Sequence, residues 1–208
     1  QRYRRKQPHF RDFTCQRGGT HTHTFTASRR AHTDLDLDIW PCSCVCSFLP
    51  PLIFSQLCKE LPPRTVGYSW QLTYSTSRHG ASLKSLYRKL RATDSPVLVV
   101  IKDALDEIFG AFLSHPLRLS ETFYGTGETF LFMLHPRFKC FRWTGENSFF
   151  IKGDLDSFAI GGGSGHFGLW VDENLYLGRS SPCYTFNNCC LSETNDFRVM
   201  ELEVWTFT

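Results

Sequence analysis

The glycine-rich segment between residues 161 and 168 is the first place where residue types and spacing could support chemistry. Residues 163–168 match the pattern G-x-G-x-x-G, which in dinucleotide-binding proteins joins a strand to the N-terminus of a helix. Here the pattern runs into Leu169-Trp170-Val171, which predicts a strand in place of the helix that would face the phosphates. We therefore interpret the segment as a connection whose glycines allow positive φ angles, and we predict no nucleotide cofactor.

Ser164 and His166 in the same segment raise the question of a serine hydrolase. Residues two apart share one face of an extended chain, so the two side chains could point the same way. The sequence G-G-S-G-H nevertheless differs from the nucleophile elbow G-x-S-x-G, and this serine lies between predicted strands instead of at a strand-to-helix turn. The sequence therefore predicts no catalytic serine, and no other catalytic residue.

The nine cysteines could bind metal or carry thiol chemistry. Cys42, Cys44 and Cys46 are separated by single residues, whereas structural zinc sites use C-x₂₋₄-C pairs, so we predict no metal site. Cys183 is the candidate reactive thiol, because Arg179 lies a short distance upstream and a nearby base lowers the pKa of a thiol. A weak thiol-based antioxidant enzyme that consumes peroxide therefore stays open as the rival function.

Glu128 is the carboxylate whose position suggests a role in a site. It follows Gly125-Thr126-Gly127 and enters the strongly apolar stretch 129–134. If its side chain points inward it needs hydrogen-bond donors, and the amides of the glycine loop could supply them. Two interpretations stay open, a binding or catalytic carboxylate and a structural carboxylate that pins the loop, and we favour the second.

Composition and charge limit the compartment and the class of partner. An odd number of cysteines, no apolar signal stretch and no N-x-[ST] acceptor favour a reducing, intracellular compartment, cytoplasmic or nuclear. Residues 1–50 hold eight Lys or Arg against four Asp, while the remainder is almost neutral, so we predict no nucleic-acid partner. Pro50 and Pro51 interrupt the most apolar stretch well short of the roughly 20 residues that span a bilayer, which predicts no membrane insertion.

The pattern of apolar residues predicts two regions. Residues 1–50 sustain neither a helical nor a strand period, so we expect a basic and mostly disordered segment. From residue 51 onward the pattern predicts short strands with Gly or Asn turns, and helices near 52–61 and after Ser82. Such a pattern indicates an all-β or α+β sandwich with few helices. In the closing strand, 198–207, simple alternation predicts that Val199, Glu201, Glu203 and Trp205 share one face.

Several blocks within residues 57–208 resemble the TLDc family, in family order. They are residues 123–132 (FYGTGETFLF), 143–147 (WTGEN), 150–154 (FIKGD), the glycines 161–163, 168–170 (GLW) and 201–205 (ELEVW). With no further module ahead of these blocks, the chain is most similar to the short TLDc-only members. The resemblance implies a strand-rich α+β fold, with a two-sheet antiparallel β-sandwich flanked by a few helices.

The resemblance also implies a function. Family members protect against oxidative stress, and they bind and regulate the peripheral sector of the vacuolar proton pump. The family has no agreed catalytic residues and no cofactor. For this chain we therefore expect a non-catalytic interaction module, monomeric, with a protein partner among the peripheral subunits of that pump.

Two groups of residues are the candidates for that interaction. The first is a rigid rim, formed by Gly125, Thr126, Gly127, Glu128, Gly161, Gly162 and Gly163. The second has a structural or functional role and consists of Trp170, Asp172, Glu201, Glu203 and Trp205.

Overall fold

The computed structural model describes residues 51–208, with side chains from residue 55 on, and the predicted basic segment 1–50 lies outside this range. The helices of this part are short. They are α1 (Pro51–Glu60), the 3-10 helix η1 (Pro63–Thr65), α2 (Thr76–His79) and α3 (Leu83–Leu90). The predicted cap of α3 is confirmed, because the Ser82 hydroxyl accepts a hydrogen bond from the Ser85 amide.

Strands make up most of the described chain. They are β1 (Trp70–Ser75), β2 (Val97–Asp103), β3 (Ile108–Leu113), β4 (Phe130–His135), β5 (Lys139–Phe141), β6 (Ile151–Gly153), β7 (Ser157–Ile160), β8 (Leu169–Asp172), β9 (Leu177–Arg179) and β10 (Asp196–Phe207). All neighbouring strands pair antiparallel. The predicted strand-rich α+β class is confirmed.

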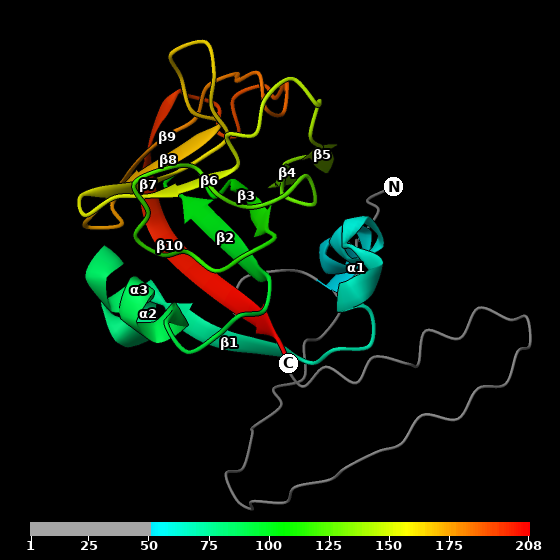
Figure 1. Cartoon of the computed structure of the whole chain (residues 1–208), viewed down its shortest axis with the longest axis vertical. Coiled ribbons are helices and arrows are strands. Elements are labelled where there is room, and N and C mark those ends of the chain that lie inside the picture. Colours follow the sequence, from blue (N-terminus) through cyan, green and yellow to red (C-terminus); the bar gives the residue numbers. More distant parts are fainter. Residues whose placement is uncertain (1–50) are drawn as a thin grey trace, which may run out of the picture. The chain divides into compact units, whose positions relative to one another are not determined.

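The long strand β10 organises the sheet (Figure 1). Its first residues pair with β9 and its later residues pair with β2 and β1, so the strand order β5-β4-β3-β2-β10-β9-β8-β7-β6 is continuous. The resemblance implied a sandwich of two sheets, and the hydrogen bonds of residues 51–208 join all ten strands through β10 into one continuous sheet. Period-two alternation reports which residues share a face, and it carries no information on whether one strand serves two groups of neighbours.

Two clusters of buried side chains hold this sheet in place. In β2, Val97, Val99 and Ile101 join one cluster, together with the leucines of α3 and residues of β6, β7 and β8. Leu98 and Val100 point the other way and join the second cluster, together with Leu57 of α1. Both faces of β2 are therefore buried, as its unbroken apolar run predicts.

A β-bulge in β10 overturns one prediction. Val199 pairs with Asp103 and Glu201 pairs with Lys102, so β10 advances by two residues while β2 advances by one. The extra residue, Met200, shifts the alternation. As a result Val199 packs in the first cluster and Trp205 in the second, and the two do not share a face.

Candidate functional site

Hydrogen bonds to Ser114, the residue that follows β3, fix the loop from Gly125 to Glu128. The Thr126 amide donates to the Ser114 hydroxyl at 2.9 Å, and the Thr129 hydroxyl donates to the same oxygen at 3.1 Å. Ser114 and Thr129 are buried, so these bonds are shielded from water. Gly125 has a φ of 105°, which favours glycine, and it packs closely against Ile151 and Phe150.

Gly127 gives the neighbouring turn a place to pack. A Cβ atom added at this glycine would lie 2.3 Å from Cε3 of Trp143, and the three nearest atoms all belong to that ring. The indole Nε1 donates to the carbonyl of Asn147 at 2.7 Å, which closes the turn 143–147 over its own tryptophan. The missing side chain at Gly127 therefore allows Trp143 to dock on the loop.

The other end of this turn binds the second group of glycines. The buried Thr185 hydroxyl donates to Oδ1 of Asn147 at 2.7 Å and accepts from the Gly162 amide at 2.9 Å. Gly163 has a φ of 96° and packs against Tyr184. The two glycine groups predicted as separate parts of one rim are thus joined by the turn 143–147. We call residues 125–128, 143–147, 161–163 and 184–185 together the glycine junction.

Exposed aromatic side chains surround the glycine junction. Trp143 is 45% exposed, Phe149 43% and Tyr184 57%. Phe123 lies between Phe149 and Phe167, at ring-centroid distances of 5.0 and 6.5 Å. We call these five rings the aromatic rim. They present large apolar surfaces on a backbone that is fixed by buried hydroxyls, which is the composition of the centre of a protein interface.

Glu128 does not take donors from the glycine loop. Its carboxylate accepts a hydrogen bond of 2.8 Å from Nε of Arg64, at the end of η1, and both side chains are partly exposed. Arg64 also donates to the carbonyl of Ser114 at 3.1 Å, so it ties Glu128 to the same residue that supports the loop. The structural interpretation of Glu128 is therefore supported, with a distant arginine as the partner.

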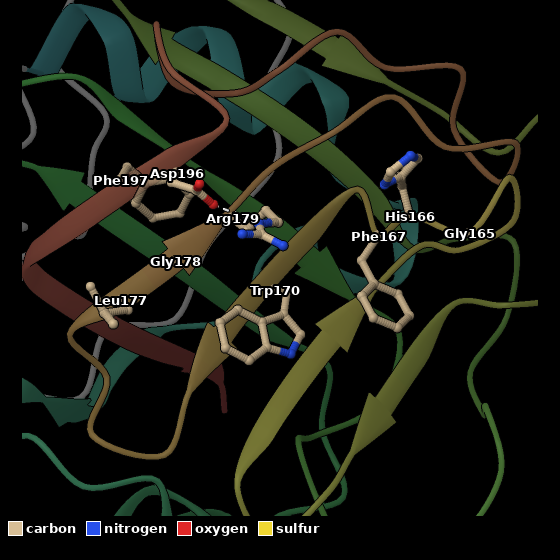
Figure 2. Close-up of a pocket in the computed structure, with 9 residues that line it drawn as sticks. All are labelled: Gly165, His166, Phe167, Trp170, Leu177, Gly178, Arg179, Asp196 and Phe197. Carbon is tan, nitrogen blue, oxygen red and sulfur yellow. Dashed lines mark hydrogen bonds and ion pairs between the residues drawn. The ribbon is translucent and has the colours of Figure 1, made fainter.

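Trp170 lines an open cavity of about 570 Å³ beside this region (Figure 2). The cavity lies over β8, β9 and the start of β10, and the segment Gly165–Phe167 forms one wall. Arg179 and Asp196 form an exposed ion pair across it, with 2.5 Å between Nε and Oδ1. This pair raises the pKa of Arg179 and lowers that of Asp196, so both stay charged at neutral pH.

The carboxylates Asp172 and Glu201 stabilise turns and helix ends. Oδ1 of Asp172 accepts from the amides of Tyr176 and Leu177, at 2.8 and 3.0 Å, and so closes the connection between β8 and β9. Oε1 of Glu201 accepts from the Ser77 amide at 3.1 Å, at the first turn of α2. The geometry gives both residues structural roles.

Glu203 and Trp205 lie inside the fold. Both side chains are buried on β10, and Nε1 of Trp205 donates to Oε2 of Glu203 at 3.1 Å. They stabilise the sheet and do not reach the glycine junction. Of the second predicted group, Trp170 is the residue whose side chain lines a cavity.

Comparison of the sequence with known proteins identifies the family of this chain. A family model for the TLDc domain matches residues 46–208. The chain belongs to the TLDc family. The match begins ahead of the predicted domain boundary at residue 51, and ahead of residue 57, where the range of the resemblance begins.

Individual relatives support the same assignment. The chain is 59% identical over 152 residues to "Oxidation resistance protein 1" of Xenopus tropicalis, covering 73% of this chain and 18% of the relative. It is 56% identical over 161 residues to "Nuclear receptor coactivator 7" of Mus musculus, covering 77% of this chain and 17% of the relative. Human "Oxidation resistance protein 1" is 55% identical over 159 residues, covering 76% and 18%. The chain thus spans less than a fifth of the length of these relatives.

Cys183 does not meet the requirements for a reactive thiol in this TLDc domain. The side chain is buried beneath Gly161 and Gly168, and burial raises the pKa of its thiol. The thiol donates to Oδ1 of Asn188 at 3.2 Å, while Arg179, the base expected to activate it, is paired with Asp196. The structure therefore gives no support to this candidate: position in a loop says nothing about burial, and burial favours the protonated thiol.

The described part of the TLDc domain offers neither a metal-binding cluster nor a membrane-spanning helix. Within residues 51–208, no three His, Cys, Asp or Glu side chains are grouped so that they could hold a metal ion. No helix in that range has the length and apolar character needed to cross a bilayer. Cys42, Cys44 and Cys46 lie outside the described residues.

Sequence reasoning missed three residues of the site. Trp143 and Asn147 were recognised as part of a family block, but their role in joining the two glycine groups requires the contacts with Gly127 and Thr185. Arg64 was missed because it lies 64 residues from Glu128 in the chain. The spacing of residues within a turn gives no information on such long-range contacts.

Proposed function

We propose that this TLDc domain is a non-catalytic protein-binding module in protection against oxidative stress. The observation that carries the proposal is the glycine junction with its aromatic rim. Rings such as Tyr184 and Phe149 offer large contact areas at a small cost in side-chain entropy. The adjoining glycine loops are held in place because the Thr126 amide donates to the buried Ser114 hydroxyl and the Gly162 amide donates to the buried Thr185 hydroxyl, so the surface is organised before a partner arrives.

For the partner we propose peripheral subunits of the vacuolar proton pump, with the domain acting as a monomer in the cytoplasm, the nucleus or both. The support is the membership of the TLDc family and the similarity to oxidation resistance proteins. Binding would regulate assembly of the pump. The buried Cys183 gives no support to the rival thiol enzyme.

Binding of the intact chain to the isolated peripheral sector of the pump tests the proposal. Tyr184 is 57% exposed at the rim, and Tyr176, 47% exposed in the turn between β8 and β9, is the matched control. We expect Tyr184→Ala to weaken binding by about fivefold or more, corresponding to a loss of about 1 kcal/mol, because aromatic residues at the centre of an interface dominate affinity. Tyr176→Ala should leave affinity within about twofold, as peripheral contacts do.

A peroxide assay on the same protein separates binding from catalysis. Catalytic peroxide consumption that a single Cys→Ser substitution among the described cysteines abolishes would contradict the binding proposal. The proposal also fails if Tyr184→Ala and Tyr176→Ala bind alike, or if the unaltered chain does not bind the peripheral sector at low salt.

A further inference from the structure

Helix α3 presents a strongly basic exposed face. Its buried face consists of Leu83, Leu86 and Leu90. Three of its five other positions carry Lys84, Arg88 and Lys89, and Arg91 follows as the C-terminal cap residue. The helix contains no Asp or Glu, so none of these charges is balanced within its own turns.

A groove of about 680 Å³ runs between the C-terminal half of α3 and the segment 115–119 that follows β3. Arg88 and Arg91 line it from the helix, and Arg118 and His115 line it from the opposite segment. The accessible apolar surface of the floor comes from Pro116 and the half-exposed Leu119, because Leu90 and Leu117, which also line the groove, are each 1% exposed. The groove therefore combines cations on two walls with an apolar base.

The wall that carries Arg118 is fixed in place by Tyr124. The Arg118 amide donates to the Tyr124 hydroxyl at 2.9 Å, and this hydroxyl donates to the Pro116 carbonyl at 3.0 Å. The guanidinium of Arg118 lies over the same ring, 4.9 Å from its centroid. Burial raises the pKa of Tyr124 to about 12, so the ring stays neutral at physiological pH and these contacts persist.

The charge of the groove is not balanced by the part of the chain that the structure describes. None of the ion pairs within the described residues includes Arg88, Arg91 or Arg118. The cations of those ion pairs are Arg64, Lys102, Arg142, Lys152 and Arg179. Asp94 is the single carboxylate among the described residues that line the groove. Asp154, close to Tyr87 at one end, pairs with Lys152 instead.

We propose that this groove is a second protein-binding surface, which takes an acidic segment of a partner that also carries apolar side chains. Arginine binds carboxylates through two parallel N–H donors, and three arginines on two walls can receive carboxylates spaced along an extended or helical segment. The apolar floor would bury the interleaved apolar side chains, a contact that free phosphate or a nucleic-acid backbone does not make. The groove shares no lining residue with the glycine junction, so the two surfaces can be tested separately.

The test uses the full chain and a fluorescein-labelled peptide in which Glu and Leu alternate. We expect saturable binding that weakens as salt is added, because surface charges are screened. Arg88→Glu with Arg91→Glu should weaken binding by about tenfold or more, since each substitution replaces attraction with repulsion. Arg137→Glu with Arg198→Glu makes the same change in net charge on exposed residues outside the groove, and should alter affinity by less than about twofold.

Further arms identify the class of ligand and control for folding. A peptide of Glu and Ser should bind more weakly than the Glu and Leu peptide, because it leaves the apolar floor uncovered. Arg88→Gln with Arg91→Gln should also weaken binding, and this variant replaces the Glu variant if the Glu substitutions unfold the protein.

Equal affinity of the groove variants and the Arg137 and Arg198 control would overturn the proposal. It would also be overturned if single-stranded RNA or phosphatidylserine vesicles displaced the peptide more effectively than unlabelled peptide. The Tyr184→Ala variant should bind the peptide normally, so loss of this surface and loss of the glycine junction give different results.

Discussion

The contact between Gly127 and Trp143 can be tested by a substitution of one methyl group. In Gly127→Ala the new Cβ would lie 2.3, 2.9 and 3.1 Å from three atoms of the Trp143 ring, all well inside van der Waals contact. The ring must move, and its Nε1 bond of 2.7 Å to the Asn147 carbonyl must lengthen or break. Overpacking costs about 1–3 kcal/mol and a lost hydrogen bond about 1 kcal/mol, so we expect a destabilisation of about 2–4 kcal/mol.

Urea unfolding of the full chain, followed by tryptophan fluorescence and circular dichroism, measures this loss. In a separate thermal unfolding experiment the midpoint should fall by about 4–16 °C, given about 2–4 °C per kcal/mol for a domain of this size. A double-mutant cycle then isolates the cause. In the Trp143→Ala background the three atoms that clash are gone, so Gly127→Ala should cost less than about 0.5 kcal/mol. The reasoning would be refuted if Gly127→Ala cost the same in both backgrounds.

Three further predictions concern the same region. Thr185→Val should destabilise the fold by about 1–3 kcal/mol in urea unfolding, because the Gly162 amide would lose its buried acceptor; an unchanged midpoint would argue against the network. Cys183 should react with iodoacetamide far more slowly than the exposed Cys189 in the native protein, as mass spectrometry of the labelled peptides can show; comparable rates would mean that Cys183 is accessible. Tyr124 has its pKa raised to about 12 from 10.0, so the folded state favours its neutral form, and the resulting stability is present below pH 10 and lost between about pH 10 and 12. Tyr124→Phe should therefore show a shallower loss of stability over that interval, and an unchanged slope would contradict the assignment.

Much of the fold could be predicted because the relevant signals are local. The run of buried apolar residues in β2 and the N-cap of α3 at Ser82 can each be recognised from a few consecutive residues. The bulge at Met200 could not be predicted, because it depends on the pairing of β10 with β2. The continuity of the sheet depends on the same strand, since β10 pairs with β9 at its start and with β2 and β1 later. The alternation of apolar and polar residues along a strand does not indicate which distant strands pair with it.

The candidate site was predictable in its parts and not in its connections. The glycine groups 125–127 and 161–163 were recognised from turn chemistry, and both lie in the glycine junction. What joins them is the packing of Trp143 on Gly127 and the hydroxyl of Thr185, which requires the folded chain. For Cys183 the local sequence was misleading. Its position in a loop suggested that solvent reaches the sulfur, but Gly161 and Gly168 pack over the sulfur and bury it.

Photo-crosslinking of the intact chain tests the central proposal, that the glycine junction binds a protein partner, most directly. A benzophenone side chain would replace Tyr184 at the rim in one protein and Tyr176 in the turn between β8 and β9 in another, both positions being exposed. After irradiation in cells, the account predicts that the label at position 184 captures a peripheral subunit of the vacuolar proton pump, identified by mass spectrometry, and that the label at position 176 does not. Capture of that subunit from position 176 and not from position 184 would contradict it.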